Sequence, residues 1–344
     1  MIDGLYKVFK HSSGVCTDTR KIKENNIFFS LKGGDFNGND FALEALSQGC
    51  SFAIVDESRP EFKGSEGIIE VKNALETLQQ LAYQHRRRLK IPFIALTGSN
   101  GKTTTKELLK SALSEQYECY ATQGNFNNHI GVPLSILEIN PDHEIAIIEM
   151  GANHQGEIAD LCRIAKPDYG LITNIGLAHL EGFGGEEGVF KGKKELFDFI
   201  LENNGTLFIN LDDEKIVRAA TGNEGTTYGS NKNADYSGTY SANCGKLSLS
   251  WTRSDLSENH LIQTQLTGSY NFSNVMAAIA VSRYFGVSPP KIKAGITKYK
   301  PSNQRSQMEE TTRGNSVIID CYNANPSSMS VAINNLIEIG AKTK

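Results

Sequence analysis

The stretch Ile94-Ala-Leu-Thr-Gly-Ser-Asn-Gly-Lys-Thr-Thr-Thr-Lys106 decides the fold of this chain. An apolar, strand-like run over residues 93–96 leads into a glycine-bearing turn, and a helical pattern follows over residues 107–113. A strand that feeds a helix through such a turn points backbone N–H groups and the positive helix end at one place, which suits a phosphate chain. We therefore predict a phosphate-binding turn, with Lys102 on the outer phosphates and the Thr103 hydroxyl facing a magnesium ion.

This turn is shorter than the usual phosphate loop. Leu96 stands where the pattern G-x-x-x-x-G-K-[ST] places its first glycine, so the sequence keeps only the form T-G-x-x-G-K-T-T. A glycine turn without a ligand is the alternative. The strand before the turn, the helix after it and the Gly-Lys-Thr between them favour the phosphate site.

Length, charge and cysteine spacing set broad limits on the function. At 344 residues the chain is long enough for two or three domains, and its net charge of -4 gives no general attraction to nucleic acid. The six cysteines lie far apart without paired spacing, which disfavours a disulfide framework or a zinc site. The N-terminal residues lack the apolar segment of a signal peptide, and no apolar run approaches the length of a membrane span. We expect a cytoplasmic enzyme.

Residues 1–90 are expected to form a small α/β domain. Strand-like runs cover residues 27–31 and 52–55, and a helical pattern between them ends at Gly49. Asn73, with Glu76 three residues later, is typical of a capping box that opens a further helix. That helix ends in the basic residues 86–90, which we interpret as a solvated last turn favoured by the helix dipole; a basic binding patch is the alternative.

Residues 91–303 alternate strand and helix, which predicts a parallel sheet covered on both faces. Glu149 lies near the end of an apolar strand, and ligands gather outside the carboxyl ends of such strands, so we expect Glu149 to face the phosphate turn. His179 lies on a glycine-rich loop and is a candidate functional residue. The alternative is that this histidine has no function. Residues 205–267 change to short alternating strands, which favours an antiparallel insertion.

Two groups of polar side chains lie on predicted helices of this region. The helix over residues 189–201 carries three lysines, which composition alone places at the surface. Asn271 and Asn274 are one turn apart at the start of a later helix, where two amides can grip a flat polar ligand edge. The alternative is that Ser269 or Asn271 only caps this helix.

The chain ends in the first elements of a third domain. Residues 316–320 are strand-like, and one helix follows to about residue 340. Residues 304–344 are too few to bury a sheet and fall short of the usual domain size of roughly 50 to 250 residues. We therefore expect an incomplete C-terminal domain.

Five motifs together resemble the Mur ligases, the ATP-dependent amide-bond ligases of peptidoglycan precursor synthesis. The phosphate turn looks like theirs, and four further motifs are similar to the MurF-type branch. These four are Gly124-Asn-Phe-Asn-Asn-His-Ile-Gly-Val-Pro133, Glu149-Met-Gly-Ala-Asn-His-Gln-Gly-Glu157, Ala178-His-Leu-Glu-Gly-Phe-Gly184 and Asp320-Cys-Tyr-Asn-Ala-Asn-Pro326. The stretch from Thr17 to Gly38 resembles the uridine-nucleotide-binding domain shared with the MurE type. The resemblance covers nearly the whole chain.

The resemblance implies an α/β fold with the three-domain Mur ligase architecture. Residues 1–90 would be the domain that binds the UDP-linked substrate, and residues 91–303 the central parallel-sheet P-loop ATPase domain with its antiparallel insertion. Residues 304–344 would be only the start of a Rossmann-like C-terminal domain. The implied reaction adds D-alanyl-D-alanine to UDP-N-acetylmuramoyl-tripeptide through an acyl phosphate, in a monomeric cytoplasmic protein.

The resemblance also implies roles for single residues. ATP would bind with two magnesium ions, the first held by Thr103 and Glu149 and the second by His179 and a carbamylated lysine. A Lys-x-x-x-aromatic register assigns the carbamate to Lys193, with Lys191 and Lys194 as close alternatives. Lys102, Glu149, His179 and Lys193 would be catalytic. The nucleotide-binding set is Gly98, Ser99, Asn100, Gly101, Lys102, Thr103, Thr104, Asn271, Asn274, Arg305, Asp320, Asn323 and Asn325. The set for the UDP-linked substrate is Thr19, Arg20, Asn127 and Asn128.

Two departures from the family pattern and three rival functions stay open at this point. Residues 301–307 differ from the more usual Pro-Gly-Arg form, and Cys321 replaces a common serine.

A MurE-type ligase is the first rival function; the motif at 151–156 and the pair Asn127-Asn128 speak against it. A folylpolyglutamate synthase lacks the unit over residues 1–90. A nucleotide-binding module without turnover is the rival from another class, kept open by the incomplete C-terminal domain.

Overall fold

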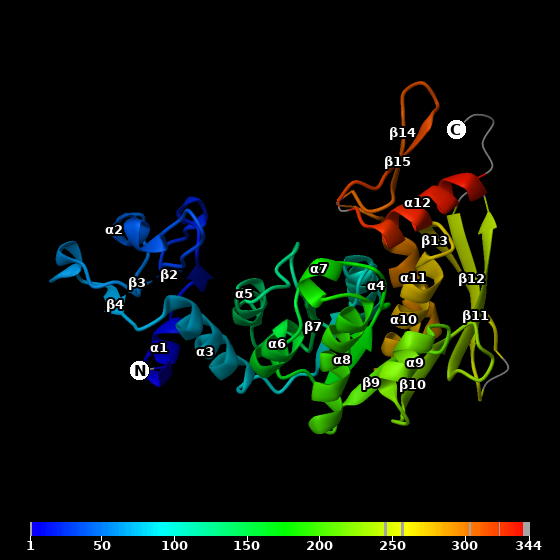
Figure 1. Cartoon of the computed structure of the whole chain (residues 1–344), viewed down its shortest axis with the longest axis horizontal. Helices are drawn as coiled ribbons and strands as arrows, with labels where there is room; N and C mark the ends of the chain where they lie inside the picture. The colour runs from blue at the N-terminus through cyan, green and yellow to red at the C-terminus, as the bar shows by residue number, and fades with distance from the viewer. Residues whose placement is uncertain (1, 244–245, 256–257, 303, 323, 340–344) are drawn as a thin grey trace. The chain divides into compact units, whose positions relative to one another are not determined.

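The computed structural model describes residues 2–243, 246–255, 258–302, 304–322 and 324–339 (Figure 1). It consists of two compact units. The first comprises Met1–Lys90, Thr122–Pro141 and Arg163–Lys166, and the second comprises Ile91–Ala121, Asp142–Cys162 and Pro167–Lys344. None of the helices in the described part of the chain combines the length and the apolar character that a membrane crossing needs.

The first unit is built on a four-stranded parallel sheet. Its strands follow the chain order β1 (Val15–Cys16), β2 (Ile27–Phe29), β3 (Phe52–Val55) and β4 (Ile68–Glu70). The strands β2 and β3 are apolar because they lie in the interior, where Phe28 and Val55 pack with helix residues. The helices and 3-10 turns of the unit are α1 (Ile2–Phe9), η1 (Thr19–Lys21), η2 (Gly38–Phe41), α2 (Ala42–Ser47), η3 (Pro60–Phe62), α3 (Ala74–Arg86) and α5 (Gly131–Leu137).

Helix α3 begins as predicted and ends differently. The Asn73 side chain accepts from the backbone N–H of Glu76, which confirms the N-cap half of the predicted capping box. The Glu76 carboxylate accepts from Gln80, and the described contacts do not include its return bond to the Asn73 N–H. The prediction of a solvated last turn is wrong for Arg86, whose exposed fraction is 8%. Its guanidinium donates to the carbonyl oxygens of Ala165 and Lys166 at 2.8 Å, because these groups at the end of helix α6 (Glu157–Ala165) have no partner within their own helix.

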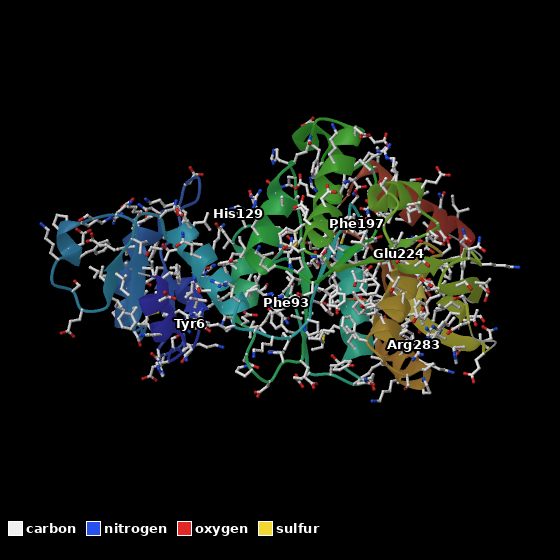
Figure 2. All side chains as sticks on the ribbon, turned by 90° about the horizontal axis from the view of Figure 1, so that it is seen from below. Tyr6, Phe93, His129, Phe197, Glu224 and Arg283 are labelled. Atoms are coloured by element: carbon white, nitrogen blue, oxygen red, sulfur yellow. The ribbon has the colours of Figure 1, made fainter. Side chains whose placement is uncertain are left out.

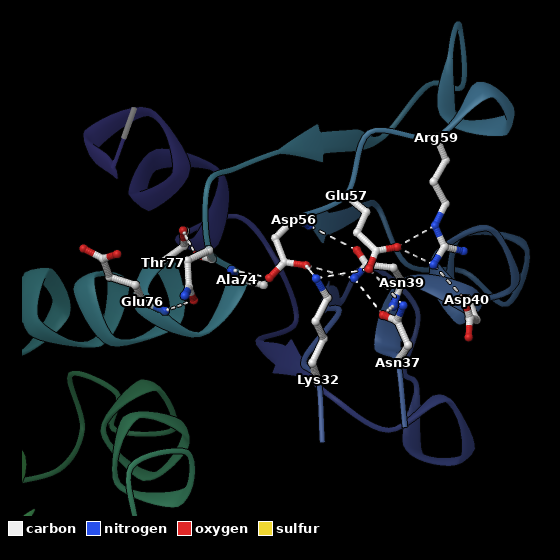
Figure 3. A network of polar contacts seen from close by, with 11 residues as sticks. Lys32, Asn37, Asn39, Asp40, Asp56, Glu57, Arg59, Ala74, Glu76 and Thr77 are labelled. Carbon is white, nitrogen blue, oxygen red and sulfur yellow. Dashed lines mark hydrogen bonds and ion pairs between the residues drawn. The ribbon is translucent and has the colours of Figure 1, made fainter. Parts of the chain in front are cut away.

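A polar network holds the loop after β2 against the end of β3 (Figure 3). Lys32 Nζ lies 3.0 Å from Asp56, and the Asn39 amide both donates to Asp56 Oδ1 and accepts from the Asp56 N–H. Asp56 also accepts from the backbone N–H of Ala74, the first residue of α3. Burial raises the pKa of Asp56, but the hydrogen bonds from Asn39 and Lys32 lower it below its usual range. The carboxylate therefore stays ionised and ties loop, strand and helix together.

The second unit is built on one nine-stranded sheet with the order β13-β12-β11-β10-β9-β8-β5-β7-β6. The strands from β6 to β11 pair in parallel, and β11, β12 and β13 pair antiparallel. Their bounds are β5 (Phe93–Thr97), β6 (Cys119–Ala121), β7 (Ile145–Glu149), β8 (Tyr169–Ile172), β9 (Thr206–Asn210), β10 (Gly225–Gly229), β11 (Tyr236–Asn243), β12 (Lys246–Arg253) and β13 (His260–Thr267).

Helices cover both faces of this sheet. The helices α4 (Lys102–Leu113), α10 (Asn271–Tyr284) and α11 (Pro289–Lys298) share one core with Leu171 of β8. The neighbouring Gly170 points the other way, where a Cβ would lie 2.8 Å from Ile200 of α8 (Glu186–Glu202). Helices α7 (Leu180–Phe183) and α9 (Glu214–Ala220) contact α8. Phe93 of β5 and Phe197 of α8 are fully buried in this unit (Figure 2).

The fold class predicted from the sequence is confirmed, with one correction of detail. The antiparallel strands are not a separate insertion over residues 205–267, because β9 and β10 continue the parallel sheet and β11 to β13 extend it. Pro289 and Pro290 open α11, since a proline in the first helical turn has no N–H to leave unpaired.

The described residues at the C-terminal end of the second unit form three elements. Strands β14 (Gln307–Glu310) and β15 (Ser316–Ile319) form an antiparallel pair, and helix α12 (Pro326–Glu338) follows. Asn325 caps this helix in a capping box with Ser328. The predicted strand and helix of this region are thus confirmed.

Candidate active site

The phosphate turn lies at the end of β5, between β7 and β8. The chain runs from β5 to β6 and β7 on one side and to β8 on the other, which makes this edge the topological switch point of the sheet. The loop after β8 holds the turn in place: Asn174 binds the backbone N–H groups of Ser99 and Asn100, and Thr173 Oγ1 donates to the Asn100 carbonyl at 2.6 Å. The backbone of the turn is therefore fixed by the loop that follows β8.

Glycine is required at both ends of the turn. Gly98 has φ +149° and Gly101 has φ +78°, backbone conformations that L side chains rarely adopt. A Cβ at Gly98 would lie 2.0 Å from Thr173 Oγ1, and one at Gly101 would lie 2.8 Å from Asn274 Oδ1. Any side chain at either position would separate the turn from the groups that support it.

Lys102 is the first residue of α4, directly after the turn. Its ammonium donates back to the carbonyl oxygens of Gly98 at 2.7 Å and Ser99 at 3.3 Å, so the side chain lies over the turn. Burial lowers the pKa of Lys102, and the nearby Glu149 carboxylate opposes this. Thr104, half-buried, lies in the same first helical turn, whose N–H groups are free of intrahelical partners by geometry.

Thr103 and Glu149 meet behind the turn. The Thr103 hydroxyl lies 3.1 Å and 3.3 Å from the two carboxylate oxygens of Glu149, and both residues are buried. A hydroxyl and a carboxylate are hard oxygen donors of the kind that Mg²⁺ prefers. Among the described residues, no three His, Cys, Asp or Glu side chains come together to hold a metal. The pair fits a magnesium ion that takes its remaining ligands from phosphate and water.

Lys106 lies beside this pair and was missed in the sequence. Its side chain has no solvent exposure, and its Nζ is 3.7 Å from Glu149 Oε2 and 3.1 Å from Glu107 Oε1. The signal that points to it is its spacing, because a residue four positions after Lys102 lies on the same face of the helix.

His179 and Lys193 form a second polar group near the turn. His179 has a left-handed backbone with φ +54°, uncommon for a residue other than glycine. Burial lowers its pKa, and the charges of Lys193 and Lys102 lower it further. These shifts favour the neutral imidazole, which is the form that binds metals.

The surface location expected for the lysines of α8 is wrong for Lys193. It is 2% exposed, with Nζ 3.4 Å from the Ala152 carbonyl and 5.0 Å from the Phe183 ring centre. Burial, and then the charge of Lys102, lowers its pKa to about 7. Lys191 is exposed, and Lys194 is half-buried and pairs with Asp198.

Asn271 and Asn274 lie at the start of α10, buried against the phosphate turn. Asn271 donates to the Thr267 carbonyl, Asn274 donates to Asn271 Oδ1, and Thr105 Oγ1 donates to Asn274 Oδ1. Neither amide caps the helix, whose N-cap is Tyr270. The two asparagines thus link α10 to α4 through a chain of hydrogen bonds.

The C-terminal candidates lie on the segments around β14 and α12. The Arg305 guanidinium stacks on the Tyr322 ring at 3.8 Å, and its Nε has no hydrogen-bond partner among the described residues. Asp320 accepts from the Ser306 hydroxyl at 3.1 Å. Asn325 donates to Asn100 Oδ1 in the phosphate turn at 2.9 Å. Asn323 lies outside the described residues.

A cavity of about 370 Å³ lies beside His179. It is lined by Asn153 and Asn325, by Glu181, and by the apolar side chains of Leu177 and Leu180. Polar groups around a partly apolar space are typical of a small-molecule site.

The candidates for the UDP-linked substrate lie in the first unit. Thr19 and Arg20 are in η1, where the exposed Arg20 side chain makes two hydrogen bonds of 2.9 Å to Asp18. These bonds lower the pKa of Asp18 to about 2. Asn128 Oδ1 accepts from the backbone N–H groups at the start of α5, and Asn127 lies directly before it.

Comparison with known proteins identifies the family. Residues 96–282 match the Mur ligase middle domain. The UDP-N-acetylmuramoyl-tripeptide--D-alanyl-D-alanine ligase of Bacillus subtilis is 37% identical over 320 residues, which are 93% of this chain and 69% of that protein. The chain belongs to the MurF family of Mur ligases. The enzyme of the same name from Escherichia coli is 34% identical over 94% of this chain and 72% of its own length.

Solved MurF structures have the same fold. MurF from Acinetobacter baumannii aligns with a TM-score of 0.85 and 31% identity, over 95% of this chain and 71% of that one. MurF from Thermotoga maritima in complex with ADP aligns with a TM-score of 0.85 and 27% identity, over 97% and 76%. The family and the fold class predicted from the sequence are thereby confirmed.

Proposed function

We propose that this MurF-family chain joins the terminal carboxylate of UDP-N-acetylmuramoyl-tripeptide to the amine of D-alanyl-D-alanine, driven by ATP. The observation that carries the proposal is the buried Thr103–Glu149 pair directly behind the phosphate turn, at the switch point of the sheet. That geometry supports ATP binding at the turn, and the names of the relatives support the two other substrates. The same relatives favour this reaction over the MurE-type addition of a single amino acid.

The reaction proceeds in two displacements. A carboxylate oxygen of the tripeptide attacks the γ-phosphorus of ATP, the bond from this phosphorus to ADP breaks, and an acyl phosphate forms. The amine nitrogen of D-alanyl-D-alanine then attacks the acyl carbon, the C–O bond to phosphate breaks, and the amine loses a proton. Both partners of the first step are anions, so the protein must neutralise charge and align the reactants.

The residues of the second unit divide this work. Lys102 and the N–H groups of residues 98–104 would bind the phosphate chain. Asn271 and Asn274 would support the adenine side, Arg305 and Asp320 the nucleotide and its ribose, and Asn323 and Asn325 the γ-phosphate. In the first unit, Thr19, Arg20, Asn127 and Asn128 would contact the UDP-linked substrate. We further propose the division into domains at 1–90, 91–303 and 304–344, and a monomer in the cytoplasm.

Two magnesium ions would complete the site. Thr103 and Glu149 would hold the first, and His179 and a carbamate on Lys193 would hold the second. The ions would supply positive charge at the phosphate oxygens. The neutral imidazole of His179 and the oxygen donors of Thr103 and Glu149 suit that role.

The carbamate on Lys193 is supported by burial of this lysine next to other cations. A lysine must lose its proton before its nitrogen attacks CO2, and a pKa of about 7 leaves much of Lys193 neutral at pH 7 to 8. We expect a carbamate ¹³C signal from protein equilibrated with ¹³CO2, and its loss in Lys193→Ala but not in Lys194→Ala. Turnover of Lys193→Ala should recover in part with a small carboxylate.

Phosphate release from ATP tests the proposed reaction. We expect release with UDP-N-acetylmuramoyl-tripeptide and D-alanyl-D-alanine together, and a new amide product by mass spectrometry. Release with a free amino acid in place of the dipeptide would indicate the MurE-type reaction. Binding of ATP and the UDP-tripeptide without any phosphate release would restrict the chain to a binding function.

A further inference from the structure

A lysine is buried beside the carboxylate of the proposed metal site. Lys106 has a side chain with no solvent exposure, and Glu149 has a side chain that is 2% exposed. Their charged atoms are 3.7 Å apart, and Lys106 Nζ also lies 3.1 Å from the partly exposed Glu107. Buried charges in proteins are paired, because an isolated charge loses its hydration without compensation.

The position of Lys106 separates its role from that of Lys102. Lys102 lies over the phosphate turn, with Nζ on the carbonyl oxygens of Gly98 and Ser99. Lys106 lies one helical turn deeper, where its Nζ contacts Glu149 Oε2. A ligand on the phosphate turn therefore meets Lys102, whereas Glu149 keeps Lys106 as its neighbour within the protein.

We propose that Lys106 is a positioning residue that acts as the permanent counter-charge of Glu149 and withholds this carboxylate from a free divalent cation, so that the metal enters only together with a phosphate chain. This inference rests on the proposed function, because it concerns the metal that accompanies ATP. The Lys106 cation cancels the single negative charge of Glu149, and Lys102 adds a second positive charge nearby. Counted together with Glu107, which also pairs with Lys106, these groups carry no net negative charge. A free dication is therefore not attracted to the site, whereas the phosphate oxygens of a nucleotide supply the negative charge that it needs.

Binding of Mn²⁺, followed by electron paramagnetic resonance, tests the proposal without turnover. The proteins are wild type, Lys106→Met, Glu149→Gln, and the double variant. Methionine retains the length of the lysine stem without its charge. Lys110→Met is the matched control, because it removes one positive charge from the same helix one turn further on, at a half-buried position away from Glu149.

The expected result is a gain of metal binding without nucleotide. Lys106→Met should bind one Mn²⁺ at least about tenfold more tightly than wild type, since a repelling charge is removed at short range. The double variant should lose that ion, which assigns it to Glu149, and Lys110→Met should behave like wild type. An unchanged Mn²⁺ isotherm in a folded Lys106→Met, with only a lower melting temperature, would show a purely structural role and overturn the proposal.

Comparison of wild type with Glu149→Gln gives a second test if Lys106→Met does not fold. With a non-hydrolysable ATP analogue, wild type should bind Mn²⁺ more tightly than Glu149→Gln. Without the analogue, the two proteins should bind Mn²⁺ equally. The same Glu149-dependent affinity in both conditions would overturn the proposal. Wild type that binds neither the analogue nor Mn²⁺ in its presence would instead contradict the proposed function.

Discussion

Gly101 and Asn274 contact each other so closely that a Cβ on the glycine would lie 2.8 Å from Oδ1 of the asparagine. Gly101 also has a left-handed backbone, with φ +78°. Gly101→Ala should therefore lower the free energy of unfolding by about 1–3 kcal/mol, through backbone strain and the displaced amide. It should also weaken nucleotide binding, because the turn would separate from α10. Urea denaturation and nucleotide titration measure the two effects.

Gly286→Ala is the control for backbone strain. Gly286 has φ +79°, almost the value of Gly101, but a Cβ there meets no atom within 4 Å. This variant should lose stability through strain alone and retain nucleotide affinity. Equal losses of nucleotide affinity in the two variants would show that the contact with Asn274 is unimportant for the turn.

Lys102→Met should weaken nucleotide binding by about 10- to 100-fold, the range of a lost charge-assisted hydrogen bond. The ammonium lies over the phosphate turn, on the carbonyl oxygens of Gly98 and Ser99. Fluorescence titration with a labelled ATP analogue provides the measurement. Lys110→Met, which removes a lysine from the same helix away from the turn, should keep wild-type affinity. Unchanged affinity in Lys102→Met would rule out the phosphate site.

The pKa of Lys193 makes stability depend on pH. Its folded value of about 7 lies below the ordinary 10.5, so between these values the unfolded chain binds a proton that the folded chain does not. Stability should therefore rise with pH across this window, by up to about 1.4 kcal/mol per pH unit from this group. Lys193→Met removes the titrating group, so its free energy of unfolding should depend less on pH between 7.5 and 9.5.

Urea denaturation in CO2-free buffer measures this difference in slope. Lys191→Met is the control, because Lys191 is exposed on the same helix. It should reproduce the pH dependence of wild type. Parallel profiles for wild type and Lys193→Met would contradict the depressed pKa.

The phosphate turn was predictable because local sequence determines it. The apolar run of β5, the two glycines and the helical pattern of α4 lie within twenty-one residues of each other in the chain, from Phe93 to Leu113. The same holds for the Asn73 cap, which depends on residues three apart. Interactions of this kind act over one turn and are visible in a sequence.

The burial of single charged residues was not predictable, because it depends on elements distant in the chain. Lys106 meets Glu149 of β7, and Lys193 lies under the loop of Ala152. Likewise, β9 and β10 resemble the antiparallel strands that follow, and only the pairing of β9 with β8 and of β10 with β9 makes them parallel. Sequence periodicity indicates which face of an element is apolar. It does not indicate which distant residue pairs with a lysine that is buried on such a face.

Arg86 is a buried charged residue of the first unit. Its guanidinium donates to the carbonyl oxygens of Ala165, Lys166 and Leu89, and the side chain is almost fully buried. Arg86→Met would leave these carbonyl groups without their donor, which should lower the free energy of unfolding by about 2–4 kcal/mol. Arg87→Met removes the same charge from the exposed neighbour and should change stability by less than about 0.5 kcal/mol. Urea denaturation followed by circular dichroism compares the two. Similar small losses in both would mean that the Arg86 contacts are no stronger than those of a solvated last turn.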